Sequence, residues 1–131
     1  MAEIDLFVVG AHLTGQPLNH QLVDAGGTLV SSTVTAPQYR LYALETAPPK
    51  PGLTRVSEGG ASIEGEVWRL PAAGFGNFVA AVPQPMVIGQ VTLADGNQVS
   101  GFLVEPVALT TAPDISGLGG WRSYLESVPG R

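Results

Sequence analysis

The sequence predicts an α+β domain whose small, mixed and mostly antiparallel sheet curls into a closed or partly closed barrel, with two or three short helices. Three observations predict this class. Segments rich in valine, threonine and aromatic residues recur along the chain and are typical of strands. Tight turns join most of them, because 17 of the 131 residues are glycine and 11 are proline. The helical patterns are short, and we expect one domain over residues 1–131.

The N-terminal elements are a strand, a turn and a helix. Residues 6–9 are β-branched and aromatic, and we expect Gly10 to end this strand because glycine adopts positive φ without a Cβ clash. Pro17 suits the first position of a helix over residues 17–25, since its missing N–H would lack a partner there, and Gly26-Gly27 end the helix. The free N–H groups of such a turn, together with a helix start, favour a small anion, so we expect a carboxylate ligand.

The middle of the chain is predicted to form strands. Residues 28–36 are rich in Val, Thr and Ser, and residues 39–44 alternate rings with aliphatic side chains. The proline-rich segment 48–52 is expected to be a stiff surface connection, because proline fixes φ and biases the preceding residue away from helix. A short strand over residues 53–56 and a longer one over residues 61–70 follow.

The C-terminal half combines helices with a hairpin. Residues 71–82 carry an apolar stripe behind a proline, which predicts a helix. Asp95-Gly96-Asn97 is a hairpin signal, so strands over residues 87–93 and 99–104 should pair antiparallel. Within residues 114–125, aromatic and apolar side chains at helical spacing predict a short helix docked on the body.

Charge and cysteine content exclude several classes of function. The formal net charge is -5 and the six basic residues do not cluster, so we expect no nucleic-acid partner. The chain has no cysteine, which excludes disulfides and thiolate chemistry and suits a reducing compartment. No apolar run reaches the length of a membrane helix, and the N-terminal residues do not form a leader. We therefore predict a cytoplasmic protein that does not enter the membrane.

The two histidines are the strongest candidates for chemistry, because both lie between the first strand and the end of the helix that follows. His20, next to Asn19, should face a pocket at the turn, where it could donate a proton near neutral pH, so we take it as the candidate catalytic residue. The alternative is a capping or buried, hydrogen-bonded histidine. His12 is either a structural residue of the turn or a contact to the ligand.

The turn itself is the candidate binding site for a carboxylate. After Gly10, the backbone N–H groups of Ala11, His12 and Leu13 could donate to the ligand, and the side chain of Asn19 could add a contact. Two histidines without an acidic third ligand nearby make a weak metal site. We therefore expect no metal and no cofactor.

Four residues on the predicted strands could contribute to this site. Arg40 could bind a carboxylate through two N–H groups, or it could be solvated. Tyr39 is expected in the core or in the pocket wall. Glu64 and Glu66 lie on one strand face, where they would either perform acid–base chemistry beside the pocket or face solvent.

Six blocks of the sequence, in the same order, carry a resemblance to a known family and together cover nearly the whole chain. The first block begins Val9-Gly10-Ala11-His12, and the blocks span residues 9–22, 35–42, 49–53, 63–68, 82–89 and 119–125. The chain is similar in these blocks to the C-terminal domain of allophanate hydrolase, which belongs to the gamma-glutamylcyclotransferase-like superfamily. The resemblance implies a small mixed barrel that binds its ligand at the turn after the first strand.

The same resemblance implies an activity. In allophanate hydrolase an amidase domain removes ammonia from allophanate, and the C-terminal domain is associated with decarboxylation of the product, N-carboxycarbamate, by a histidine. Here Val9-Gly10-Ala11-His12 replaces the superfamily turn Tyr-Gly-Ser-Leu, and the helix over residues 71–82 lacks the cyclotransferase glutamate. The only lysine, Lys50, leaves no serine–lysine pair for amidase chemistry. We therefore expect neither an amidase nor a typical cyclotransferase.

Two hypotheses of function follow. In the first, a stand-alone domain binds a small carboxylated urea or carbamate and assists its decarboxylation in urea or allophanate breakdown. His20 would donate the proton, and the turn, Asn19, Tyr39 and Arg40 would surround the ligand. In the second, a non-catalytic module binds a small carboxylate or an amidase partner. A separate amidase chain and a second copy in a homodimer are the protein partners that the sequence allows.

Overall fold

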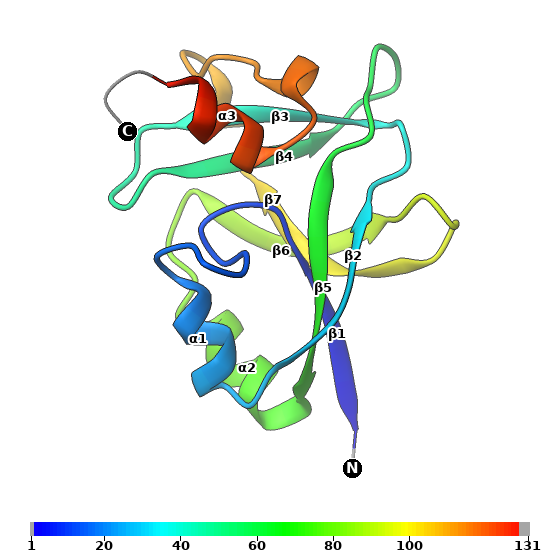
Figure 1. Ribbon diagram of the computed structural model, residues 1–131, viewed down its shortest axis with the longest axis vertical. Coiled ribbons are helices and arrows are strands. Elements are labelled where there is room, and N and C mark those ends of the chain that lie inside the picture. Colours follow the sequence, from blue (N-terminus) through cyan, green and yellow to red (C-terminus); the bar gives the residue numbers. More distant parts are fainter. Residues whose placement is uncertain (1, 129–131) are drawn as a thin grey trace.

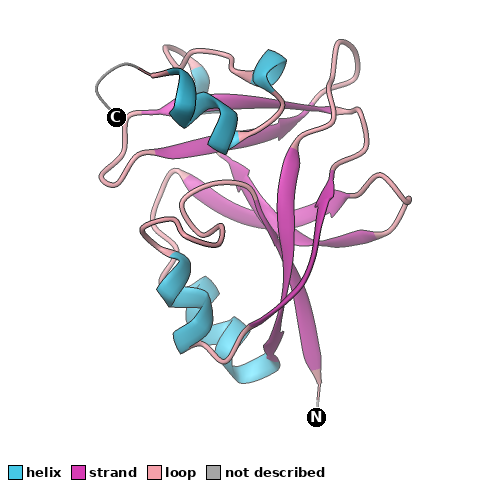
Figure 2. Cartoon of the chain, viewed as in Figure 1, coloured by secondary structure: helices cyan, strands magenta, loops and turns pink. Residues whose placement is uncertain are grey.

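The computed structural model describes residues 2–128, whose strands form two sheets with three α-helices packed outside them (Figure 1, Figure 2). The strands are β1 (Glu3–Val8), β2 (Thr28–Val34), β3 (Tyr39–Leu44), β4 (Lys50–Arg55), β5 (Glu64–Pro71), β6 (Met86–Thr92) and β7 (Gln98–Val104). The helices are α1 (Asn19–Asp24), α2 (Ala72–Ala80) and α3 (Trp121–Ser127), with 3-10 helices at Pro106–Leu109 and Ser116–Leu118. The larger sheet has the order β2-β5-β1-β7-β6, and β3 pairs with β4 in the smaller sheet.

Strand β1 is the centre of the larger sheet. It pairs antiparallel with β5 and parallel with β7, and the other strand pairs within residues 2–128 are antiparallel. The predicted α+β class and the mixed, mostly antiparallel sheet are therefore confirmed. Of the two predicted forms, a closed barrel is not present in residues 2–128, where the sheet is at most partly closed. The edge strands β2 and β6 meet only around a bridge between Thr35 and Leu93, because β3 and β4 pair with each other and form their own sheet across one end.

The hairpin between β6 and β7 is confirmed, together with its antiparallel register from Met86 opposite Val104 to Thr92 opposite Gln98. Gly96 has a φ of 89°, which only glycine adopts without strain at this turn. The carboxylate of Asp95 accepts a hydrogen bond of 2.9 Å from the backbone N–H of Asn97. Turn chemistry encoded within a few residues thus fixes this element.

Strand β4 begins earlier, and helix α1 begins later, than the local sequence patterns predict. Strand β4 begins at Lys50 rather than residue 53, because Lys50 and Pro51 pair across the hairpin with Leu44 and Ala43. The stiff surface connection predicted over residues 48–52 is therefore wrong from residue 50 onwards. Helix α1 begins at Asn19 rather than at residue 17, and it is only six residues long.

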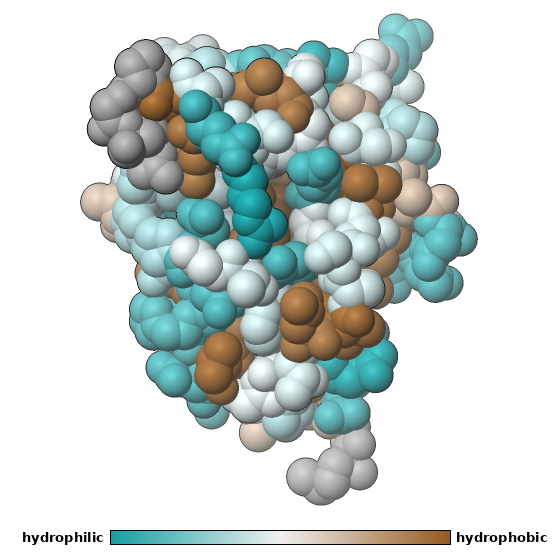
Figure 3. Space-filling model, viewed as in Figure 1, coloured by the Kyte–Doolittle hydropathy of each residue, from teal (hydrophilic) through white to brown (hydrophobic). Residues whose placement is uncertain are grey.

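Strand β2 is an edge of the larger sheet and is mostly exposed. Leu29 and Val30 are about half exposed on it, and Val23 is exposed on the neighbouring α1. Figure 3 shows brown apolar patches on this face, set among polar side chains. An uncovered edge can pair with a further strand, so a homodimer or an amidase partner at this edge stays a prediction.

The core lies between the two sheets and the helices. Its largest fully buried side chains include Phe7, Leu22 and Tyr39, and Trp121 is 2% exposed. Burying each such side chain contributes roughly 1.5–3 kcal/mol relative to leaving it exposed. Within residues 2–128, no helix is long and apolar enough to cross a membrane.

Glu66 is a buried carboxylate that connects three separate segments. Its Oε1 accepts hydrogen bonds from the backbone N–H of Thr14 at 2.9 Å, the hydroxyl of Thr14 at 3.1 Å and the indole N–H of Trp68 at 3.1 Å. Arg122 on α3 donates to its Oε2 at 3.3 Å and to the carbonyl oxygen of Thr14 at 2.7 Å. Glu66 therefore neither faces solvent nor lines the larger cavity described below, whereas Glu64 is exposed.

Burial by itself raises the pKa of the Glu66 carboxyl, since it disfavours the charged form. The hydrogen bonds from Thr14 and Trp68 and the charge of Arg122 stabilise the carboxylate and outweigh burial, so the pKa of Glu66 is lowered. A lowered native pKa stabilises the fold above the pKa that glutamate has in the unfolded chain. This contribution is lost as the pH falls through the native pKa.

We predict that Glu66→Gln lowers the free energy of unfolding at pH 7 by roughly 1–3 kcal/mol, because several donors lose a charged acceptor. The difference between wild type and variant should shrink below about pH 4.3, where unfolded glutamates take up protons. Urea denaturation at pH 7 and at pH 3 measures it. Glu64→Gln is the matched control, since Glu64 is exposed on the same strand. An equal effect of both substitutions at both pH values would contradict the role of Glu66.

Candidate functional site

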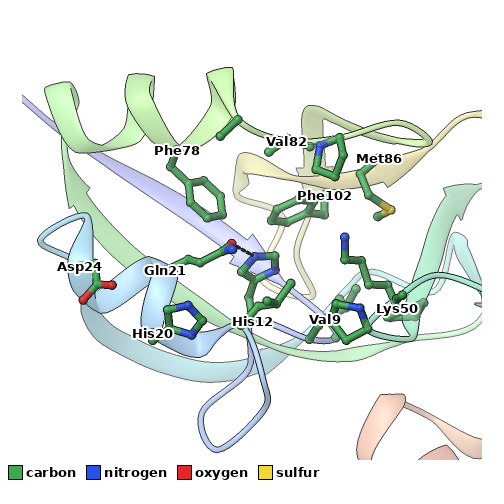
Figure 4. Close-up of a pocket in the computed structure, with 18 of the residues that line it drawn as sticks. Val9, His12, His20, Gln21, Asp24, Lys50, Phe78, Val82, Met86 and Phe102 are labelled. Atoms are coloured by element: carbon green, nitrogen blue, oxygen red, sulfur yellow. Dashed lines mark hydrogen bonds between the residues drawn. The ribbon is translucent and has the colours of Figure 1, made fainter.

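A cavity of about 550 Å³ lies between the turn after β1, helix α1, the end of α2 and the beginning of β4 (Figure 4). Segments that are distant in sequence form its walls. The turn contributes Gly10-Ala11-His12, and α1 contributes His20, Gln21 and Asp24. The opposite walls come from α2, from the segment before β4 and from the strands β6 and β7.

Gly10 holds the turn against β4. The residue is buried, and a Cβ built on it would overlap the ring of Pro51. Gly10 does not have a positive φ, so the predicted reason for glycine here is wrong: the position requires close approach of the turn backbone to the ring of Pro51. Because Pro51 packs on the turn, its neighbour Lys50 is placed on the same cavity as His12.

His12 lies at the centre of the cavity wall and is 8% exposed. Its Nε2–H donates a hydrogen bond of 2.9 Å to Oε1 of Gln21. The ring stacks on Phe102 at a centroid distance of 4.9 Å and meets the edge of Phe78 at 5.3 Å. Asn19 donates to the carbonyl oxygen of His12 at 2.9 Å. These contacts fix the orientation of the imidazole and leave Nδ1 as the atom that can exchange a proton.

The surroundings of His12 keep its ring neutral. Burial lowers the pKa of His12, the hydrogen bond to Gln21 raises it, and the nearby charges of Lys50 and His20 lower it further. The net result is a lowered pKa. At neutral pH the imidazole is therefore uncharged. A change in the charge beside it, such as that of Lys50, would change how readily it takes up a proton.

Two charged side chains and a second imidazole complete the polar part of the cavity. Lys50 points its ammonium into the cavity near Phe102, whereas Asp24 lies on the far side, on α1 (Figure 4). His20 is exposed, and its Nδ1–H donates to the carbonyl oxygen of Pro17 at 3.1 Å. This bond leaves Nε2 of His20 for contact with a ligand.

The structure brings together some of the predicted site residues. Gly10, Ala11, His12 and His20 line the cavity. Leu13 does not, because its side chain is buried and contributes to a second, smaller cavity next to α3. Asn19 supports the turn through its bond to the carbonyl oxygen of His12 and does not line the cavity.

The strand residues Tyr39 and Arg40 also lie outside the cavity. Tyr39 is fully buried, and its hydroxyl accepts a hydrogen bond of 2.9 Å from the N–H of Thr92. The guanidinium of Arg40 pairs with Asp114 at 2.5 Å and donates to the carbonyl oxygen of Gly59. Both residues therefore connect parts of the fold, and Arg40 is not placed to bind a carboxylate in this cavity.

Sequence reasoning missed the residues that face the turn across the cavity. Lys50, Gln21 and Phe102 are the most informative of them. Lys50 is the only lysine of the chain, and this is the one signal that could have drawn attention to it. Within residues 2–128, no group of three or more His, Asp or Glu side chains is placed to hold a metal ion.

Comparison with known proteins decides the family. Residues 4–126 match the family described as the allophanate hydrolase C-terminal domain. The chain belongs to this family. It is 41% identical over 128 residues to the urea amidolyase of Lachancea kluyveri, covering 94% of this chain and 7% of that protein. The chain thus spans only about 7% of the length of the curated relatives it matches.

Solved structures agree with this relationship. The urea amidolyase of K. lactis has a TM-score of 0.94 and 42% identity, covering 98% of this chain and 8% of that one. A uropathogenic E. coli-specific protein has a TM-score of 0.90 and 35% identity, covering 98% of this chain and 99% of that one. An AIG2-like protein of Mus musculus, at 18% identity and a TM-score of 0.62, shares the fold over 87% of this chain and 86% of that one. The gamma-glutamylcyclotransferase-like fold of the domain is therefore shown.

We predict that Lys50→Met raises the pKa of His12 and that Gln21→Leu lowers it. The first substitution removes a positive charge that disfavours the imidazolium, and the second removes a hydrogen bond that favours it. NMR titration of the imidazole resonances measures both changes. Arg55→Met, on the same strand as Lys50 but exposed and outside the cavity, should leave the titration unchanged. Equal pKa values of His12 in all variants would contradict this account.

Proposed function

We propose that this domain binds a small carboxylated carbamate of the N-carboxycarbamate type and assists its decarboxylation. The observation that carries the proposal is that a buried histidine and the only lysine of the chain face one cavity. The family supports the choice of ligand, since its relatives are a urea amidolyase and an allophanate hydrolase.

A carboxylate would be held between the Lys50 ammonium and the turn. Lys50 is half-buried and is the one cationic lysine or arginine among the described residues that line the cavity. Ala11 and His12 also line it, and no hydrogen bond within residues 2–128 engages their backbone N–H groups. Charge-assisted hydrogen bonds to a carboxylate are stronger than those between neutral groups. The six-residue helix α1 is too short to add a helix-terminus site.

The reaction needs one proton at one atom. As carbon dioxide leaves N-carboxycarbamate, the bond between nitrogen and the departing carboxylate carbon breaks and its electron pair stays on nitrogen. A proton must reach that nitrogen to give carbamate. We assign this transfer to His12, because a carboxylate at Lys50 lies beside its ring and would favour the imidazolium that donates the proton from Nδ1.

His20 is the alternative donor. It lines the same cavity, its Nδ1–H is held by the carbonyl oxygen of Pro17, and its free Nε2 could deliver a proton. It lies on α1, on the side of Asp24 rather than that of Lys50 (Figure 4). Its role as the catalytic residue stays a prediction that the same experiment tests.

A non-catalytic module is the second candidate function. The neutral state of the His12 imidazole favours it, since a neutral ring whose Nε2–H is held by Gln21 has no proton at Nδ1 to donate to a ligand. Such a module would bind the carboxylate product of an amidase. That amidase would be either another part of a longer protein or a separate chain.

We predict that the wild-type domain accelerates carbon dioxide release from N-carboxycarbamate that a separate amidase generates from allophanate. His12→Asn should lower the acceleration about a hundredfold or more, as expected for loss of a general acid. His20→Asn should retain most of it. Mass spectrometry of carbon dioxide from labelled allophanate, against the uncatalysed background, measures the rates.

Each variant is compared with wild type by circular dichroism and thermal unfolding, so that loss of fold is separated from loss of chemistry. If His20→Asn lost the acceleration and His12→Asn kept it, the proton donor would be His20 rather than His12. No acceleration by the folded wild type would reject the decarboxylase function and leave the binding module.

A further inference from the structure

The cavity is larger than a carboxylated carbamate requires. Its volume is about 550 Å³. A ligand as small as N-carboxycarbamate would leave more than half of this space to water. Cavities of roughly 300–1,000 Å³ typically bury ligands of many more atoms.

Polar and apolar side chains gather at different ends of the cavity, with His12 between them. Helix α1 places His20 and Asp24 at one end (Figure 4). The other end is built by Phe78, Met86 and Phe102, each no more than 8% exposed, and the ring of His12 packs on the two phenylalanines. The ammonium of Lys50 points to the boundary, near Phe102 and Met86 (Figure 4). A carboxylate at Lys50 would therefore have an apolar wall directly beside it.

The cavity offers a fixed cation to one carboxylate. Lys50 supplies one positive charge, Asp24 supplies one negative charge, and the lowered pKa of His12 keeps its ring neutral in the empty cavity. A second carboxylate, such as that of N-carboxycarbamate, is compensated only where it lies beside His12 and the imidazole takes up a proton; placed toward Asp24 it would lack a cation. An uncompensated charge in a partly buried site is unfavourable.

We propose that the cavity is a site for a monocarboxylate that carries an aliphatic or aromatic group. The carboxylate binds Lys50, and the apolar group lies against Phe78, Met86 and Phe102. This inference rests on the carboxylate position of the proposed function but not on decarboxylation. It adds a ligand class that contacts the apolar wall as well as the cation.

The test measures affinities of the full chain for acetate, butyrate and hexanoate by NMR titration. Affinity should rise roughly threefold to fourfold for each methylene that becomes buried. Hexanamide has the same chain without the charge and should bind at least about tenfold more weakly than hexanoate. Equal affinities across the series, or equal binding of hexanoate and hexanamide, would overturn the proposal.

Three variants locate the ligand. Lys50→Met should reduce hexanoate binding to the level of hexanamide, whereas Arg55→Met, exposed on the same strand and outside the cavity, should not change it. Ala81→Phe adds a ring at an exposed position that lines the cavity beside Phe78. It should remove the advantage of hexanoate while acetate binds as before.

Unchanged hexanoate affinity in Lys50→Met and Ala81→Phe would place the ligand elsewhere and overturn the proposal. The decarboxylation assay is a separate readout. A chain that binds hexanoate as described but does not accelerate carbon dioxide release would retain this inference and lose the proposed enzyme activity. If the chain accelerates carbon dioxide release but does not bind hexanoate as described, the proposed activity stands and this inference is rejected.

Discussion

The close packing of Gly10 on Pro51 is the contact on which the candidate site depends. Gly10 lies two residues after the end of β1, the central strand of one sheet, and Pro51 belongs to a strand of the other. A side chain at residue 10 would overlap the proline ring and push the turn away from β4. Without this contact His12 and Lys50 would not face one cavity. The site is therefore a property of how the two sheets meet rather than of either sheet alone.

The other face of the same turn is fixed by Glu66. Its carboxylate binds both the backbone and the hydroxyl of Thr14, and Arg122 adds a contact from α3. The segment carrying His12 is thus held by Pro51 at its beginning and by a buried charge after it. A turn supported at both ends can keep an imidazole in one orientation, which binding and proton transfer both require.

Local signals in the sequence predict most of the fold but only part of the site. The hairpin at Gly96 follows from neighbouring residues, and so do the strands beside it. The burial of Glu66 depends on Thr14 and Arg122, which are far away in the chain, so local patterns could not predict it. The turn could be predicted as a site because its residues are neighbours in sequence. Lys50 could not, because 38 positions separate Lys50 from His12 and only the folded chain brings the two together.

Lys50 connects ligand binding with protonation in the proposed reaction. In the empty cavity its charge helps to lower the pKa of His12, so the ring is neutral. A carboxylate at Lys50 would offset that charge, and a second carboxylate on the same ligand would favour the imidazolium further. Proton uptake would then accompany binding of the substrate. Release of carbon dioxide consumes that proton and leaves a product with one negative charge instead of two. The product is then held less strongly, and the site returns to its neutral state without any change of fold.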